Sequence, residues 1–239
     1  ELGDPSPVIA QATAAGVTRM IAMGVNQETN AKAVELAQAH PQVWAGAGHY
    51  PLDASAFDVD AVRSLALNPR VAAIGEIGLD FQDAGEVGRP QQLERFEALL
   101  ALAVEHDLPV SIHNRGAEAD VEAAIKRHPG LRGVMHYFAL GWDWAERFLA
   151  LDLYLSFAGL VTRPSRHALR EVAARCPADR LLLETDSPYG NAHRRMNEPN
   201  RPAYLLDTAE LVAELRGVTI EELGAQETRN ALELFGRMS

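Results

Sequence analysis

Four short apolar segments of this sequence each lead to a side chain of a type that commonly binds metal ions: Glu76, His113, His136 and Asp186. Each stands where a continuous apolar run, typical of a buried strand, breaks or ends. Two carboxylates and two imidazoles make a mixed oxygen and nitrogen set that suits zinc, manganese or magnesium. Ligands this far apart in sequence meet only if their strands lie side by side and end on one face, as in a parallel barrel. The pattern therefore predicts a metal-dependent hydrolase.

Each of the four side chains also has a simpler interpretation. Glu76 could form a structural salt bridge, and His113 and His136 could be hydrogen-bonded histidines of the core. Asp186 could cap the turn that follows it. All of these would have to hold together at the ends of four strands, so one shared metal site is the better interpretation.

Short apolar runs alternate with longer stretches at helical spacing along the sequence. The expected strands are residues 19–25, 43–49, 71–78, 108–114, 133–138, 153–159 and 180–186. The expected helices are residues 27–40, 58–67, 91–106, 117–128, 143–151, 165–175, 203–215 and 219–234. Strands alternating with helices predict βαβ crossovers and a parallel sheet. We therefore expect an α/β fold, a TIM-type (β/α)8 barrel, with residues 1–239 forming a single domain.

The start of the sequence differs from that of a complete barrel. Asp4-Pro5-Ser6-Pro7 is typical of the beginning of a helix, with Ser6 as the capping residue and proline in the first turn. A closed eight-stranded barrel needs one strand more than the seven predicted. Either the barrel is incomplete or the given sequence lacks its first strand, and we expect the latter.

Composition limits the classes of function. The formal net charge of -11 argues against a broad basic face that would bind nucleic acid. It does not exclude a nucleic-acid substrate, because bound divalent cations supply positive charge locally. A single cysteine, Cys176, excludes an internal disulfide and fits a reducing cytoplasm. The sequence shows no apolar stretch of membrane-spanning length and no segment typical of a secretory leader. We therefore expect a cytoplasmic protein that does not enter a membrane. A monomer is the favoured oligomeric state.

Several other residues are candidates for substrate binding. His49 follows a strand-like run and would lie on the catalytic face. Arg115 directly follows His113-Asn114 and is a candidate anion clamp, and Arg194 and Arg195 are weaker candidates of the same kind. The aromatic side chains that could stack on a terminal base without reading its identity are Tyr50 and Tyr189.

Blocks spread over nearly the whole chain resemble, in the expected order, the signature blocks of the TatD-like metal-dependent deoxyribonucleases. These blocks are residues 75–81, 111–115, 136–138, 184–189, 197–199 and 228–236. The resemblance implies a TIM-barrel hydrolase with two divalent metal ions, Mg²⁺, Mn²⁺ or Zn²⁺. It also implies a 3′→5′ exonuclease-like activity, so that DNA or a small nucleic acid is the expected substrate.

The same resemblance assigns roles to the metal-type residues. Glu76 would bridge the two ions, His113 and His136 would hold one of them, and Asp186 would ligate the other. We expect Glu76 and Asp186 to be catalytic, since Asp186 beside a metal could orient a water molecule or accept its proton. The family's His-x-His pair on the first strand has no counterpart here, and Tyr50 separates His49 from a proline that the family places directly after the histidine.

Two other classes of function stay open. The first is a metal-dependent amidohydrolase or esterase, such as an enzyme that removes a D-amino acid from tRNA. Many binuclear barrel amidohydrolases bridge their metals with a carboxylated lysine, whereas the corresponding strand end here offers Glu76, which favours the nuclease. The second is an inactive binding protein, which would follow if the His-x-His strand were truly absent.

Overall fold

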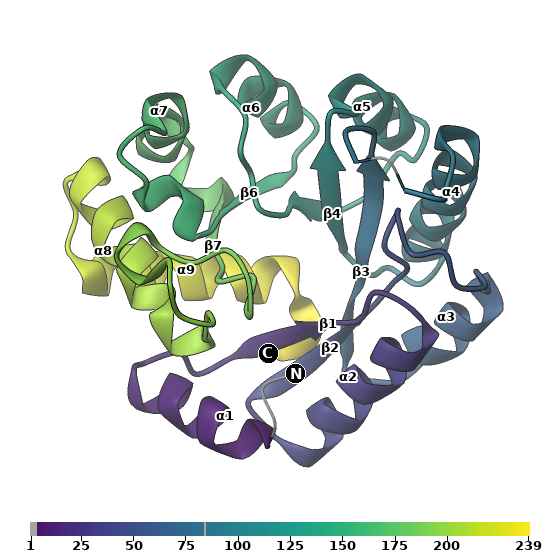
Figure 1. The fold of residues 1–239 in the computed structure, drawn as a ribbon, viewed down its shortest axis with the longest axis horizontal. Coiled ribbons are helices and arrows are strands. Elements are labelled where there is room, and N and C mark those ends of the chain that lie inside the picture. The colour runs from purple at the N-terminus through teal and green to yellow at the C-terminus, as the bar shows by residue number, and fades with distance from the viewer. Residues whose placement is uncertain (1–3, 84) are drawn as a thin grey trace. The chain divides into compact units, whose positions relative to one another are not determined.

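The computed structural model describes residues 4–83 and 85–239 (Figure 1). The chain divides into two compact units. We call Ile21–His136 together with Leu234–Ser239 the Glu76 unit, and the part up to Met20 together with Tyr137–Glu233 the Asp186 unit. The single domain expected from sequence stays a prediction.

The Glu76 unit is built from parallel strands whose neighbours follow chain order. The strands are β1 (Met20–Met23), which begins at the unit boundary, β2 (Val43–Ala47), β3 (Val71–Asp80), β4 (Val110–Arg115) and β5 (Gly133–Met135). β3 pairs with β2 on one side and with β4 on the other, and β4 pairs with β5. Nearly every residue of β3 is buried, and Glu76 is the exception. A strand buried on both faces is expected in a parallel sheet that helices cover.

Helices connect the successive strands of this unit and lie along one face of them (Figure 1). They are α2 (Gln27–Ala39), α3 (Val59–Ala66), α4 (Arg89–Glu105) and α5 (Glu118–Lys126), and the short helix η5 (Gly236–Met238) closes the chain. Asn26 and Thr29 form a capping box at the start of α2, and the Asp58 side chain caps α3. Such caps satisfy backbone N–H groups that have no partner inside the helix.

The Asp186 unit contains two parallel strands and most of the remaining helices. The strands are β6 (Tyr154–Phe157) and β7 (Leu181–Leu183). The α-helices are α1 (Pro5–Ala14), α6 (Trp142–Leu149), α7 (His167–Arg175), α8 (Leu205–Arg216) and α9 (Ile220–Leu234). Short helices η1 (Gly159–Thr162), η2 (Ala178–Arg180), η3 (His193–Arg195) and η4 (Pro202–Tyr204) lie in the loops.

The prediction that Ser6 caps the first helix is wrong. Asp4 is the capping residue, and its side chain accepts a hydrogen bond from the Ser6 N–H at 3.0 Å. Pro5 then occupies the first position of the helix, where its missing N–H costs nothing. An aspartate is as good a cap as a serine, so the proline decides where the helix begins.

The strands and helices expected from sequence all form in the described residues, but five strands end earlier than expected, β1, β2 and β6 by two residues and β5 and β7 by three. β5 stops at Met135 and β7 at Leu183, although both were expected to continue for three residues more. The backbone then turns through left-handed conformations, with φ of 48° at Tyr137 and 60° at Asp186. His136 and Asp186 therefore lie at the start of the loops that follow their strands.

No helix in the described ranges is long and apolar enough to cross a membrane.

Candidate metal centre

Three of the four predicted metal-binding residues come together in the Glu76 unit. His113 Nδ1 lies 3.0 Å from Glu76 Oε1, and His136 Nε2 lies 3.9 Å from the same oxygen. The exposed fractions of the three side chains are between 12% and 17%. These three side chains thus contact one another within this unit, and their binding of a metal ion stays a prediction.

The local backbone explains how Glu76 reaches the two histidines. The pairing of β3 with β4 is irregular between Ile74 and Ile77, the stretch that contains Glu76. Such irregularities redirect a side chain away from the regular alternation of a strand. His136 directly follows β5, and its N–H still donates to the Ile112 carbonyl of β4 at 3.0 Å. His113 within β4 and His136 directly after β5 thus come from neighbouring strands and meet Glu76, which lies within β3.

Two glycines allow the neighbouring strands to approach β3 at this point. A Cβ atom on Gly48 would come within 2.5 Å of the Glu76 carbonyl oxygen. A Cβ atom on Gly75 would come within 2.7 Å of the Ser111 Cβ atom. Both separations are far shorter than carbon atoms tolerate, so glycine is required at both positions for the Glu76 backbone to sit where it does.

Electrostatics keeps Glu76 anionic. Burial by itself would raise its pKa, but the hydrogen bond from His113 and the nearby charges of His136 and His113 outweigh that effect. The pKa of Glu76 is therefore held below its usual range. A buried carboxylate that stays ionised is suited to bind a cation.

Asp80 is a residue of this cluster that sequence reasoning missed. Its carboxylate is completely buried, and its Oδ2 lies 3.2 Å from His113 Nε2. Its Oδ1 accepts the backbone N–H groups of Gln82 and Asp83, each at 3.1 Å. The side chain of Gln92 holds the Asp80 backbone through hydrogen bonds of 2.9 and 3.0 Å. Both ring nitrogens of His113 thus face a fixed carboxylate, and a metal-binding histidine ordinarily keeps such a partner on the nitrogen that does not bind the metal.

The donor types fit a divalent cation, since an imidazole pair with a carboxylate is a common set for such ions. In the arrangement seen here the donors contact one another, and no group of three or more His, Cys, Asp or Glu side chains in the described ranges is already arranged around a metal position. Binding a cation would exchange the contact between His113 and Glu76 for coordination.

Asp186 belongs to the other unit, where it follows the end of β7 by three residues and is half-buried. Its loop is fixed by Asn200, whose Nδ2 donates to the carbonyls of Thr185 at 2.7 Å and Tyr189 at 2.5 Å. Glu184, just before it, accepts the N–H of Tyr137 at 2.5 Å. That Asp186 shares a cation with the three residues of the Glu76 unit stays a prediction.

His49 is enclosed by other side chains. It is 4% exposed, and its Nε2 accepts a hydrogen bond from Arg95 Nη1 at 2.9 Å. The same Arg95 nitrogen donates to the Asp53 carbonyl at 2.7 Å, and the ring of Phe57 packs against His49 edge to face. Burial lowers the pKa of His49 and so favours a neutral ring. These contacts favour a structural role, and substrate binding by His49 stays a prediction.

Arg115 is not a free cation. Its Nη1 donates to Asp83 Oδ2 at 2.6 Å, and both side chains are 51% exposed. A substrate phosphate would have to displace this carboxylate before Arg115 could bind it. The predicted role of Arg115 in binding an anion stays a prediction.

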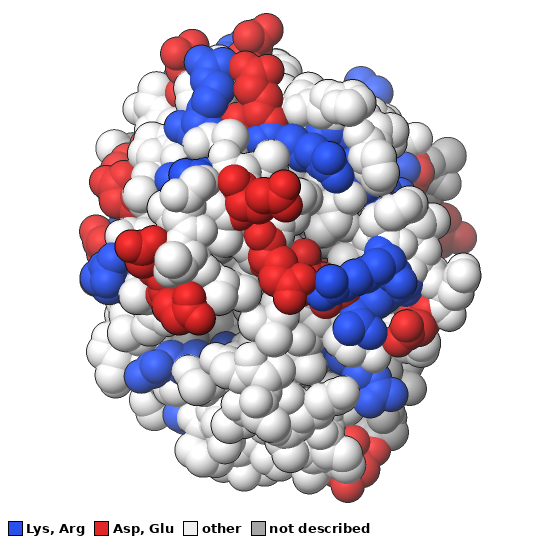
Figure 2. Space-filling model, turned by 90° about the vertical axis from the view of Figure 1, so that its left-hand side faces the viewer, with Lys and Arg blue, Asp and Glu red and all other residues white. Residues whose placement is uncertain are grey.

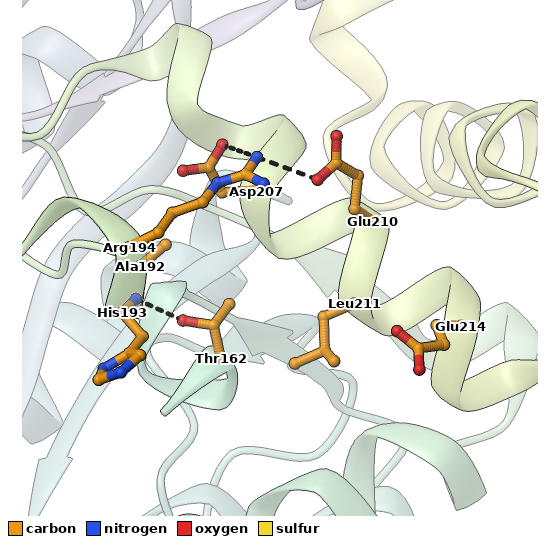
Figure 3. Close-up of a pocket in the computed structure, with 8 residues that line it drawn as sticks. All are labelled: Thr162, Ala192, His193, Arg194, Asp207, Glu210, Leu211 and Glu214. Atoms are coloured by element: carbon orange, nitrogen blue, oxygen red, sulfur yellow. Dashed lines mark hydrogen bonds and ion pairs between the residues drawn. The ribbon is translucent and has the colours of Figure 1, made fainter. Parts of the chain in front are cut away.

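Arg194 and Arg195 are also paired. Both guanidinium groups bind the buried carboxylate of Asp207, and Arg194 also lies 3.0 Å from Glu210. Figure 3 shows Arg194 between these carboxylates, at a pocket of about 290 Å³ on the Asp186 unit. Their predicted role as phosphate anchors is therefore weakened, because the negative charge they need is already supplied within the chain.

The two tyrosines expected to stack on a base differ in access. Tyr189, three residues after Asp186, is 67% exposed and open to a ligand. Tyr50 packs edge to face on His113, with ring centroids 4.9 Å apart. Tyr50 therefore supports the cluster, while Tyr189 is the better candidate for stacking.

The single cysteine is buried and free. Cys176 is 1% exposed, and burial raises the pKa of its thiol to about 12. A thiol that stays protonated at neutral pH is a poor nucleophile.

Alternating parallel strands and helices, with a carboxylate and two imidazoles brought together from three neighbouring strands, define a metal-dependent hydrolase of the α/β-barrel type. The crystal structure of YjjV, a TatD homologue from Escherichia coli K12, superimposes with a TM-score of 0.92 at 29% identity, over 98% of this chain and 92% of that one. The barrel expected from sequence is thereby confirmed.

A family model described as TatD related DNase matches residues 2–236. The chain belongs to this family. The 3'-5' ssDNA/RNA exonuclease TatD of Pantoea vagans is 39% identical, over 97% of this chain and 93% of its own length. The metal-dependent hydrolase YabD of Bacillus subtilis is 35% identical, over 97% of this chain and 92% of its own length.

Proposed function

We propose that this hydrolase removes nucleotides from the 3′ ends of single-stranded DNA with the help of two divalent metal ions. The observation that carries the proposal is the contact of Glu76 with His113 and His136, on neighbouring strands of a member of the TatD family. The name of the Pantoea vagans relative, a 3'-5' ssDNA/RNA exonuclease, supports the same substrate and direction.

Phosphodiester hydrolysis sets the roles of the residues. Bound divalent ions lower the pKa of a water molecule and offset the charge on the phosphoryl oxygens. Glu76, His113, His136 and Asp186 would hold them. Glu76 serves this role because it stays ionised, and Asp80 fixes the ring of His113 from the side away from Glu76. We assign Asp186 the role of general base, which would orient the attacking water and accept its proton.

The surface charge favours an enzyme that binds the end of a DNA strand through few contacts. The chain has a net charge of -11, and the Lys and Arg side chains in Figure 2 lie in separate groups beside Asp and Glu side chains. Tyr189, exposed three residues after Asp186, is available to stack on the terminal base. Binding through a few phosphates and one stacked base requires no particular sequence.

The direction of cleavage tests the proposal. Single-stranded DNA labelled at its 5′ end should give a ladder that shortens gradually in Mg²⁺, Mn²⁺ or Zn²⁺, whereas DNA labelled at its 3′ end should release labelled mononucleotide at once. EDTA should stop both reactions. A model ester in a parallel reaction addresses the alternative of an esterase or amidohydrolase. Rapid ester hydrolysis with intact DNA would replace the nuclease with that alternative.

A further inference from the structure

Two loops of the Asp186 unit follow parallel strands and pack against each other. The loop after β6 contains Arg163 and Arg166, and the loop after β7 contains Asp186. The His193 N–H donates to Thr162 Oγ1 at 2.7 Å and so joins the two loops. Loops that follow neighbouring parallel strands emerge at the same end of both strands, so these arginines share an edge with Asp186.

The side chains of Arg163 and Arg166 differ from the other arginines considered for phosphate binding. Arg115, Arg194 and Arg195 each contact a carboxylate. Within residues 4–83 and 85–239, neither Arg163 nor Arg166 forms an ion pair, and Arg163 Nε is buried without a hydrogen-bond partner. A buried guanidinium N–H that lacks an acceptor is unfavourable and would be satisfied by an incoming anion.

The loop that carries them is itself held firmly. Arg170, one turn into α7, donates from Nε to the Val161 carbonyl at 3.1 Å and from Nη2 to the Thr162 carbonyl at 2.8 Å. One arginine of this region therefore fixes the backbone, while Arg163 and Arg166 are left to bind something else. A fixed loop reduces the entropy lost when a ligand is bound.

Tyr137 places these arginines close to Asp186. An atom added at Gly190 would lie 2.9 Å from the Tyr137 ring and 3.1 Å from the Asp186 Cβ atom, so this ring and Asp186 flank the same glycine. Asp186, Arg163 and Arg166 each interact electrostatically with Tyr137. All three charged residues therefore lie near one tyrosine.

We propose that Arg163 and Arg166 bind the phosphodiester backbone of the substrate strand next to the scissile bond. The proposal rests on the proposed nuclease function and names the residues that hold its substrate. Guanidinium groups match phosphate oxygens with paired, charge-assisted hydrogen bonds, whereas an ammonium group acts as a point charge. Two such contacts agree with an acidic protein that grips a strand end through few phosphates.

The test combines kinetics with binding. Arg163→Gln, Arg166→Gln and the double variant should each be assayed for kcat and KM on single-stranded DNA. Binding of a fluorescent oligonucleotide should be followed against salt in EDTA. We expect KM to rise about tenfold for each arginine, as for loss of one charge-assisted hydrogen bond, with a smaller change in kcat. The salt slope of the double variant should fall by roughly 1.4, since each phosphate contact on a single strand contributes about 0.7.

A matched control removes a positive charge elsewhere in the same unit. Arg175, at the far end of α7, is 48% exposed and pairs with Glu171, so Arg175→Ala should keep the KM and salt slope of the wild type. Arg163→Lys and Arg166→Lys should recover only part of the affinity, because lysine lacks the planar fork. Arg166 is exposed, so its variants stay informative if those of the partly buried Arg163 unfold.

The outcomes separate this proposal from the nuclease function. If the wild type shortens DNA while the double variant keeps its KM and salt slope, the arginine proposal is wrong and the nuclease function stands. An equal loss of affinity in Arg175→Ala would also overturn it, since the effect would then reflect net charge alone. A wild type that neither binds nor shortens DNA would overturn both.

Discussion

Glu227, on helix α9, should make the stability of the folded protein depend on pH. Its Oε1 accepts the N–H of Leu183 at 2.9 Å, while its Oε2 is buried without a hydrogen-bond partner. Burial raises the pKa of Glu227 from 4.5 to about 8, against the opposing hydrogen bond from Leu183, and the charge of Glu184 acts in the same direction as burial. The carboxyl group is therefore protonated in the folded protein at neutral pH.

The sign of the effect follows from proton binding. Between pH 4.5 and about 8 the unfolded chain has lost the proton of Glu227 while the folded chain keeps it. The contribution of Glu227 is fully present below pH 4.5 and is lost as the pH rises toward 8, after which stability no longer changes. The slope is about 1.4 kcal/mol per pH unit, so raising the pH from 5 to 7 should lower the contribution of Glu227 to the free energy of unfolding by about 2–3 kcal/mol.

Glu227→Gln removes this titration and keeps an oxygen for the Leu183 N–H. A constant difference in stability between the glutamine variant and the wild type would not depend on pH. The change of the free energy of unfolding with pH therefore reports the titration of Glu227. Urea unfolding followed by circular dichroism from pH 5 to 8 should give a smaller fall in stability for the variant. Glu221→Gln, in the exposed first turn of the same helix, should behave as the wild type. Equal slopes for the wild type and Glu227→Gln would refute the reasoning.

Other predictions concern the site. Glu76→Gln should lower kcat/KM by more than the roughly 10²–10³ lost with one principal electrostatic contact, whereas Arg115→Ala, exposed and already paired, should retain measurable activity in the same steady-state assay. Asp80→Asn should weaken metal binding by about 10–100-fold, as measured by calorimetry, because His113 loses an anionic partner, and unchanged affinity would show that Asp80 only supports the loop. Oligonucleotide binding should show a salt slope corresponding to roughly two or three phosphates, and covalently closed circles should stay uncut, so a steep slope or rapid cutting of circles would exclude action at ends.

The elements could be predicted from sequence because the apolar pattern decides them. β3 reads as an almost continuous apolar run, and the structure buries nearly all of it. The strand ends could not be predicted as well. The left-handed residues Tyr137 and Asp186 lie in loops held by non-local contacts: the Tyr137 N–H donates to Glu184, and Asn200 donates to the carbonyls of Thr185 and Tyr189.

The sequence predicted the types of metal-binding residue in the candidate site, but it did not predict the contacts that surround them. Glu76, His113 and His136 stand out because each interrupts or ends an apolar run. The pairing of Arg115 with Asp83 joins residues 32 apart in sequence, and no local pattern indicates it. Asp80 lies within a block that resembles the TatD family, but its burial against His113 follows from the register of β3 and β4. Sequence patterns therefore do not distinguish an arginine that is free to bind phosphate from one that is paired with a carboxylate.

The measurement that tests the account most directly is a metal titration of the nuclease reaction. Protein stripped of metal should be inactive on single-stranded DNA, and its rate of nucleotide release should rise and saturate as Mn²⁺ is added. Glu76→Gln, with a matched fold by circular dichroism, should show little release at any concentration of Mn²⁺. Release of nucleotides by Glu76→Gln in metal-depleted buffer at nearly the wild-type rate would contradict the assignment of Glu76 and its histidines as the metal centre.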